Sequence, residues 1–131
     1  MRDNLRFYYS GRLYRHGPDY GVVSGAIGFA EINRDRFVSL GASYDGGTMV
    51  TKLFMVSELK DFHINAKADF GTVCVDLLNQ KMEFLKTAKP IQEEGLAIPI
   101  LWESATDNLE TEFVDLQFTL ENVLLYSYWV E

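Results

Sequence analysis

The sequence predicts an all-β fold, an antiparallel β-sandwich of jelly-roll type, for this chain of 131 residues. Three observations predict it. Apolar and polar residues alternate along short segments, and Gly, Pro, Asn and Asp separate these segments at intervals of about 8–12 residues. Aromatic residues make up 14% of the chain, which is typical of half-buried strands. Helix is expected to contribute little, because only residues 57–62 and 105–110 have room for a single turn each.

The first half of the chain is expected to hold an aromatic strand, a loop and a three-stranded antiparallel segment. Residues 11–21 (GRLYRHGPDYG) predict an irregular loop, because glycine and proline interrupt any regular pattern. The charged turn Asn33–Arg36 joins two strands as a hairpin, and a second turn at Gly46 and Gly47 leads into a third strand. These strands are predicted at Leu5–Ser10, Ala26–Ile32, Phe37–Ala42 and Met49–Val56.

The second half shows the clearest alternation, in residues 62–68, where apolar and polar side chains take opposite faces. A turn at Asn79 and Gln80 joins two strands, and Pro99 indicates an edge position or a bulge for the strand that contains it. A tight turn at Glu121 and Asn122 predicts a closing hairpin. The strands are predicted at Phe62–Ala68, Thr72–Leu78, Met82–Lys86, Leu96–Trp102, Val114–Leu120 and Val123–Val130.

Charge and composition exclude several classes of partner. The net charge of −7 and the pI near 4.8 disfavour nucleic acids and anionic membranes, and no segment approaches the ~18 apolar residues of a spanning helix. The segment MRDNLRFYYSG lacks an apolar signal core, so the chain as given is expected to be cytoplasmic, or part of a secreted protein with a signal peptide upstream. The single cysteine, Cys74, excludes an internal disulfide and leaves the compartment undecided.

No catalytic group is predicted, and the chain is expected not to be an enzyme. Asp76 and Asp115 are the only acids within clearly apolar segments, and such acids usually lie on the solvated face of a sheet. A small hydrolase that uses Asp76, Asp115 or Glu83 is a minor alternative. Cys74 lies in mid-strand between two valines, which predicts a buried structural thiol rather than a nucleophile.

No metal or cofactor is predicted either. His16 lies in the first loop and His63 on the polar face of its strand, and neither has cysteine or carboxylate neighbours at ligand spacing. A calcium site built from loop oxygens near Asp45, or near Asp107 and Asn108, is left open.

Aromatic and polar residues in the first loop are the candidates for ligand binding. Sugar rings stack on exposed tyrosine and tryptophan, while neighbouring polar side chains bind the hydroxyl groups. The alternative is that this loop packs against a partner chain or a missing domain. The candidate glycan-binding residues are Tyr14, Arg15, His16 and Tyr20 in the loop, together with Trp102 beside Glu103.

The turn Asn33–Arg36 concentrates charge. In a functional interpretation, Arg34 and Arg36 bind a carboxylate across a domain interface. The preferred interpretation is a turn in which Asp35 supplies the turn geometry and the arginines are solvated or paired with neighbouring acids.

The segment Gly25–Lys52 (GAIGFAEINRDRFVSLGASYDGGTMVTK) resembles the sequence pattern of a known family. The segment Phe62–Leu78 and the ending LYSYW resemble the same pattern more weakly. The pattern is that of the C-terminal β-sandwich segment of bacterial glycosyl hydrolase-like proteins, related to the invertase and arabinanase families, which follows a β-propeller. The resemblance implies that the catalytic acids lie in the propeller, so none transfers to this chain. It also implies that residues 1–24 are either a remnant of a neighbouring propeller or an adapted edge strand, and that residues 25–131 form the sandwich. Residues 83–102 depart from the pattern and keep only Trp102.

The resemblance leads to the main functional hypothesis, a non-catalytic accessory module associated with carbohydrate-active proteins. Its role would be that of a structural companion to a propeller-type glycosidase, with weak glycan binding in addition. The alternative is a self-associating structural protein. The segments LRFYYS and LLYSYWV are aromatic and poor in charge, and as edge strands they would pair to form a homo-oligomer.

Overall fold

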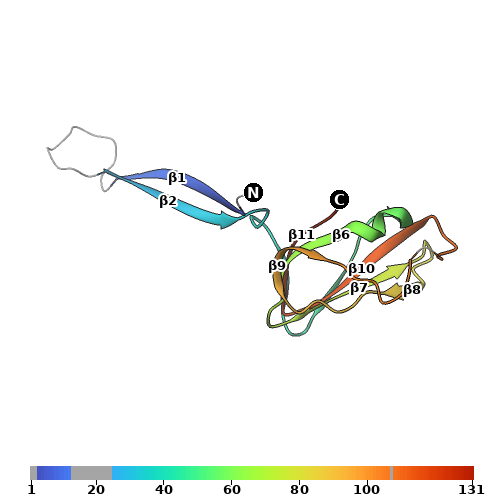
Figure 1. Cartoon of the computed structure of the whole chain (residues 1–131). Helices are drawn as coiled ribbons and strands as arrows, with labels where there is room; N and C mark the ends of the chain where they lie inside the picture. Colours follow the sequence, from blue (N-terminus) through green and yellow to red (C-terminus); the bar gives the residue numbers. More distant parts are fainter. Residues whose placement is uncertain (1–2, 13–24, 107) are drawn as a thin grey trace. The chain divides into compact units, whose positions relative to one another are not determined.

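The computed structural model describes residues 3–12, 25–106 and 108–131 (Figure 1). Strands account for 60% of the described residues and helix for 5%, and the paired strands are antiparallel. The predicted all-β class is therefore confirmed. The chain divides into two compact units, residues 1–34 and 35–131, which we call the ribbon and the body.

The ribbon consists of two strands, β1 (Asn4–Arg12) and β2 (Gly25–Asn33), paired along their whole length. The pairing runs from Asn4 opposite Asn33 to Arg12 opposite Gly25. The predicted hairpin between residues 26–32 and 37–42 is therefore wrong, because the first of these strands pairs with the N-terminal strand. The sandwich was expected from Gly25, whereas the body begins at Asp35.

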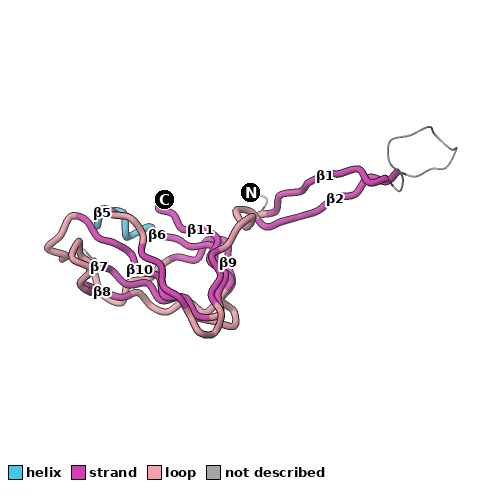
Figure 2. Tube along the Cα trace, turned by 180° about the vertical axis from the view of Figure 1, so that it is seen from behind, coloured by secondary structure: helices cyan, strands magenta, loops and turns pink. Residues whose placement is uncertain are grey.

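The body contains two antiparallel sheets with strand orders β4-β10-β7-β8 and β3-β11-β6-β9 (Figure 2). A short strand, β5, also pairs with β10, and the 3-10 helix η1 lies between β5 and β6. The edge position of β9, which contains Pro99, agrees with the prediction for that strand. The elements are β3 (Leu40–Ala42), β4 (Gly47–Val50), β5 (Phe54–Met55), η1 (Val56–Asp61), β6 (Phe62–Lys67), β7 (Thr72–Leu78), β8 (Phe84–Thr87), β9 (Glu94–Pro99), β10 (Phe113–Glu121) and β11 (Val123–Val130).

A single hydrophobic core joins the inner faces of the two sheets. Along β6 and β10 every second side chain is buried, as the alternation in the sequence predicts. The Tyr128 ring of β11 stacks on Phe62 at 6.0 Å and lies 5.5 Å from Phe118 of the opposite sheet. Burial of these apolar surfaces is the main term that holds the sheets together.

Two turns carry the chain from one sheet to the other instead of closing hairpins. Gly46 (φ 75°) lies between β3 and β4, and Asn122 (φ 48°) lies between β10 and β11. In both cases the two flanking strands belong to different sheets. The turns lie where the sequence predicts them. The predicted closing hairpin at Glu121 and Asn122 is wrong, because β10 and β11 do not pair with each other.

Candidate functional site

The ribbon has one face that is entirely apolar, which we call the apolar face. Because side chains alternate along a strand, the register places Leu5, Phe7 and Tyr9 of β1 on the same face as Ile32, Ala30 and Gly28 of β2. Leu5, Phe7 and Tyr9 are 41%, 47% and 58% exposed. The Tyr9 ring covers Gly28 so closely that a Cβ atom there would lie 2.8 Å from Tyr9 Cζ.

The opposite face of the ribbon is mixed, because it combines a charge pair with the exposed side chains of Tyr8, Ile27 and Phe29. Arg6 Nε donates to Glu31 Oε1 at 2.7 Å, and the Arg6 guanidinium lies 4.6 Å from the centre of the Phe29 ring. Tyr8 packs beside the same ring, with centroids 6.3 Å apart. The charge pair of this face therefore partly covers Phe29, while Tyr8 and Ile27 stay 70% and 82% exposed; the apolar face has no charged side chain.

A two-stranded ribbon is marginally stable in water by itself. A strand of nine residues is about 30 Å long, and two strands with their side chains are about 10 Å wide, so the apolar face covers roughly 300 Å². The largest apolar patch of a typical monomer is about 300–600 Å² and is often functional. The ribbon is therefore the first candidate for a functional surface.

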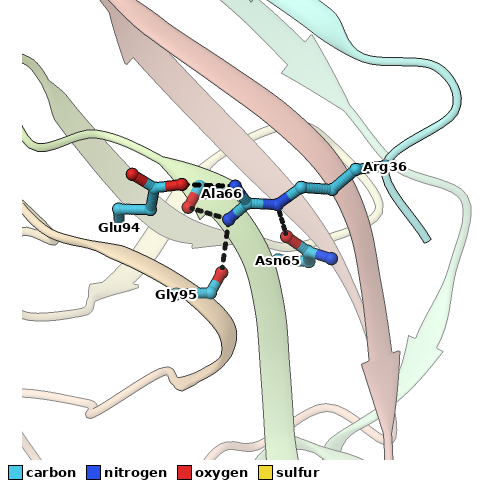
Figure 3. Close-up of polar contacts among 5 residues, drawn as sticks. All are labelled: Arg36, Asn65, Ala66, Glu94 and Gly95. Atoms are coloured by element: carbon cyan, nitrogen blue, oxygen red, sulfur yellow. Dashed lines mark hydrogen bonds and ion pairs between the residues drawn. The ribbon is translucent and has the colours of Figure 1, made fainter. Parts of the chain in front are cut away.

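The second feature is Arg36, whose side chain is only 8% exposed and lies among partners from β6 and β9 (Figure 3). Its Nε donates to Asn65 Oδ1 at 2.9 Å, and its Nη1 pairs with Glu94 Oε1. Its Nη2 donates to the carbonyl oxygens of Ala66 and Gly95, each at 3.4 Å.

The position of Arg36 follows from irregularities in the second sheet. The pairing of β6 with β9 shifts register between Ile64 and Ala66, and the pairing of β6 with β11 shifts between Leu125 and Ser127. A bulge interrupts the regular ladder and leaves backbone groups in need of other partners. The guanidinium supplies donors at this place, and the Tyr126 ring stacks on it with its centre 4.6 Å from Cζ.

Arg36 therefore stabilises the body at the point where the chain enters it. The sequence predicted an arginine that is solvated or paired with a neighbouring acid, but its partner Glu94 is 58 residues away. The hydrogen bond from Arg36 is the main cause that lowers the pKa of Glu94 below its ordinary value. Asp35 has a φ of 60°, which agrees with its predicted role in the turn.

Of the predicted glycan-binding residues, Tyr14, Arg15, His16 and Tyr20 lie outside the described residues. The Trp102 indole donates to the Leu59 carbonyl oxygen at 2.9 Å and packs against the core. One side of Trp102 also lines an open pocket of about 440 Å³, together with Lys60 and Lys89. Its role in ligand binding stays a prediction.

The candidate catalytic acids Asp76, Glu83 and Asp115 do not line the pocket beside Trp102. Asp76 is opposite Gln117 and Asp115 is opposite Leu78, so the two acids are diagonal neighbours on the outer face of the first sheet. Glu83 accepts a hydrogen bond from Asn79 Nδ2 at 2.7 Å within the β7–β8 turn. His63 stacks on Trp129 with centroids 5.8 Å apart.

Cys74 lies on the same outer face, opposite Thr119, and is half-buried rather than buried as expected. Burial raises the pKa of the Cys74 thiol, and the negative charges of Asp76 and Glu121 raise it further. A raised pKa reduces the fraction of reactive thiolate at neutral pH.

We expect Cys74 to react with iodoacetamide more slowly than an unfolded cysteine peptide at pH 7.5, because fewer thiolates are present. Asp76→Asn is expected to increase the rate several-fold by removing one negative charge. Mass spectrometry over a pH series measures both rates. A rate that Asp76→Asn leaves unchanged would contradict the electrostatic part of this explanation.

Comparisons with protein-family models, curated proteins and solved structures identified no match to the chain. In the described part of the chain, no helix is long and apolar enough to cross a membrane. Within the same residues, no group of three or more His, Cys, Asp or Glu side chains is placed to hold a metal ion. The apolar face of the ribbon and the Arg36 cluster are the features on which a functional argument can be built.

Proposed function

We propose that the chain is a non-catalytic accessory module, in which the body is a structural companion and the ribbon attaches it to a partner protein. The observation that carries this proposal is the apolar face. Leu5, Phe7 and Tyr9 are each more than 40% exposed, on a two-stranded element that needs further packing to be stable. A protein surface that covers this face would supply that packing.

The resemblance to propeller-associated sandwiches suggests the partner, a propeller-type glycosidase-like domain. A propeller blade is a four-stranded antiparallel sheet, and the ribbon is an antiparallel pair. Among the described residues, β1 and β2 pair only with each other, so each has an outer edge that can accept a further strand. This mode of attachment is β-strand addition.

A jelly-roll topology for the body is part of the same proposal. Its support is the strand order: each sheet combines an early strand, a late strand and two middle strands, as in β3-β11-β6-β9. The turns at Gly46 and Asn122 also support a jelly roll, because each joins strands of different sheets. A jelly roll consists of two such four-stranded sheets.

We also propose that the accessory module binds glycans weakly. The pocket beside Trp102 supports this role. An aromatic side chain with neighbouring lysines and hydroxyl groups, from Lys60, Lys89, Ser104 and Thr106, offers both stacking and hydrogen bonds. Titration with neutral and acidic oligosaccharides tests this role. Absence of binding by any of them would remove it without touching the ribbon.

We expect Phe7→Asp to abolish binding to a purified propeller-type glycosidase-like protein from the same organism, because it places a charge in the middle of the apolar face. The matched control is Ser10→Asp, which adds the same charge to the opposite face of the same strand. Calorimetric titration measures the affinity, and amide hydrogen exchange of β1 and β2 should slow in the complex. Binding that Phe7→Asp leaves intact would contradict the proposal.

A further inference from the structure

The pocket beside Trp102 is built around an indole that hydrogen bonds hold in place. Lys89 N donates to the Leu101 carbonyl oxygen at 2.8 Å, and Trp102 forms an isolated bridge with Ala88. The indole N–H donates to the Leu59 carbonyl oxygen at 2.9 Å. The aromatic wall is therefore fixed before a ligand arrives, which lowers the entropic cost of binding.

Lysines gather at this pocket. Lys60 and Lys89 are two of its lining residues. Lys86 Nζ donates to the carbonyl oxygen of Ala105, which is another lining residue. These three lysines belong to a body, residues 35–131, that has only seven basic residues and sixteen acidic ones. Among the described residues no acidic side chain lines the pocket, so it is a basic site on an acidic body.

The negative charge of the body does not cancel this local positive charge. Asp61 and Glu103 adjoin lining residues in the sequence, but both are exposed to solvent and neither lines the pocket. At physiological ionic strength the interaction of exposed charges is screened beyond ~8 Å. A ligand with many negative charges extends past the pocket and meets the repulsion of the body. Charge therefore favours a ligand with one negative group.

The apolar part of the lining favours an organic ligand over a bare inorganic anion. Trp102 is half-buried, and Leu101 beside it is 55% exposed. The C–H face of a sugar ring packs on such side chains, whereas a phosphate ion gains nothing from them. Ser104 adds a hydroxyl group that can bond to sugar hydroxyls. The volume of about 440 Å³ lies within the ~300–1,000 Å³ of small-molecule sites.

We propose that the pocket beside Trp102 binds a uronic acid, the class of sugar that combines an apolar ring face with one carboxylate. The ring lies against Trp102 and Leu101, and the carboxylate accepts hydrogen bonds from Lys60 and Lys89. This inference rests on the weak glycan binding proposed above and specifies its ligand. It does not depend on the partner proposed for the ribbon.

The exposure of the lysines sets the size of the expected preference. An ion pair at a solvent-accessible site changes the affinity by a few-fold, so two pairs together give about a tenfold preference for the acidic sugar. For a disaccharide in an open pocket we expect a dissociation constant of about 1 mM. Salt should reduce the preference, because charges in about 1 M salt are screened beyond ~3 Å.

The test compares two ligands that differ only in charge, a disaccharide of glucuronic acid and xylose and the methyl ester of that disaccharide. Titration of the full chain followed by protein NMR measures both dissociation constants, at low salt and in about 1 M salt. We expect the acid to bind about tenfold more tightly than the ester at low salt, and the difference to shrink at high salt. Equal affinities at low salt would overturn the inference and leave weak glycan binding in place. If neither ligand binds, the inference and the glycan role fall together, while attachment through the ribbon is tested separately by Phe7→Asp.

Two variants that remove the same charge locate the site. Lys89→Gln removes a lining lysine and keeps the backbone N–H, whereas Lys81→Gln removes an exposed lysine of the β7–β8 turn that does not line the pocket. Lys89→Gln should reduce the preference for the acid several-fold, and Lys81→Gln should leave it unchanged. A preference that survives Lys89→Gln in full would overturn the inference. Inorganic phosphate that binds as tightly as the acidic disaccharide would also overturn it, because the pocket would then be a general anion site.

Discussion

Arg36→Ala is expected to lower the free energy of unfolding by about 3 kcal/mol, because it leaves buried polar groups without their donor. The side chain of Asn65 is nearly fully buried and accepts from Arg36 Nε at 2.9 Å. Removal of the guanidinium also uncovers the Tyr126 ring and takes the cationic partner from Glu94. Urea denaturation followed by circular dichroism measures the difference.

Two further variants separate the contributions at this cluster. Arg36→Lys keeps the charge but cannot donate to Asn65, Ala66 and Glu94 at once, so we expect it to recover only part of the loss. Glu94→Gln is expected to cost less than about 1 kcal/mol, because Glu94 is partly exposed and its pair is screened by water. A loss below about 0.5 kcal/mol for Arg36→Ala would show that the cluster does not stabilise the body.

The lowered pKa of Glu94 gives the pair a defined dependence on pH. A carboxylate whose pKa is lowered by folding contributes stability above its unfolded pKa, near the ordinary value of 4.5. That contribution disappears as the pH falls through the lower pKa of the folded state. The difference in stability between the unaltered chain and Glu94→Gln should therefore shrink below pH 4.5, and a difference that grows there would contradict the assignment.

The strands were predictable because their signal is local. In β6 and β10 the two-residue alternation of apolar side chains follows from one face being buried, and it can be read from each segment alone. The pairing of strands was less predictable. The turns at Gly46 and Asn122 have the residues that favour hairpins, yet each joins strands of different sheets, and turn chemistry does not distinguish these two outcomes.

The Arg36 cluster could not be predicted for a related reason. Its parts, Arg36, Asn65 and Glu94, are far apart in the sequence, and each alone resembles an ordinary polar surface residue. Asn65 even occupies a polar position in the alternation of residues 62–68, yet it is buried and accepts a hydrogen bond from Arg36. The ribbon shows the opposite case, since the aromatic segment LRFYYS stands out in the sequence, while the pattern of its partner strand, residues 25–33, does not distinguish it from a strand of the sandwich.

Phe118→Ala is expected to lower the free energy of unfolding by about 4 kcal/mol, the largest effect of any single change considered for this chain. Phe118 is fully buried, and β10 is paired with β4 and β7 on its two sides. The strands are fixed by these backbone pairings, so the sheets cannot close over the cavity that the substitution leaves. The Tyr128 ring, 5.5 Å away, would lose a packing partner at the same time.

The matched control is Phe84→Ala, which removes the same atoms from a side chain that is 62% exposed. It should change the free energy of unfolding by less than about 1 kcal/mol, since little apolar surface returns to water. Equal losses of stability for the two variants would mean that β10 does not lie at the centre of the core.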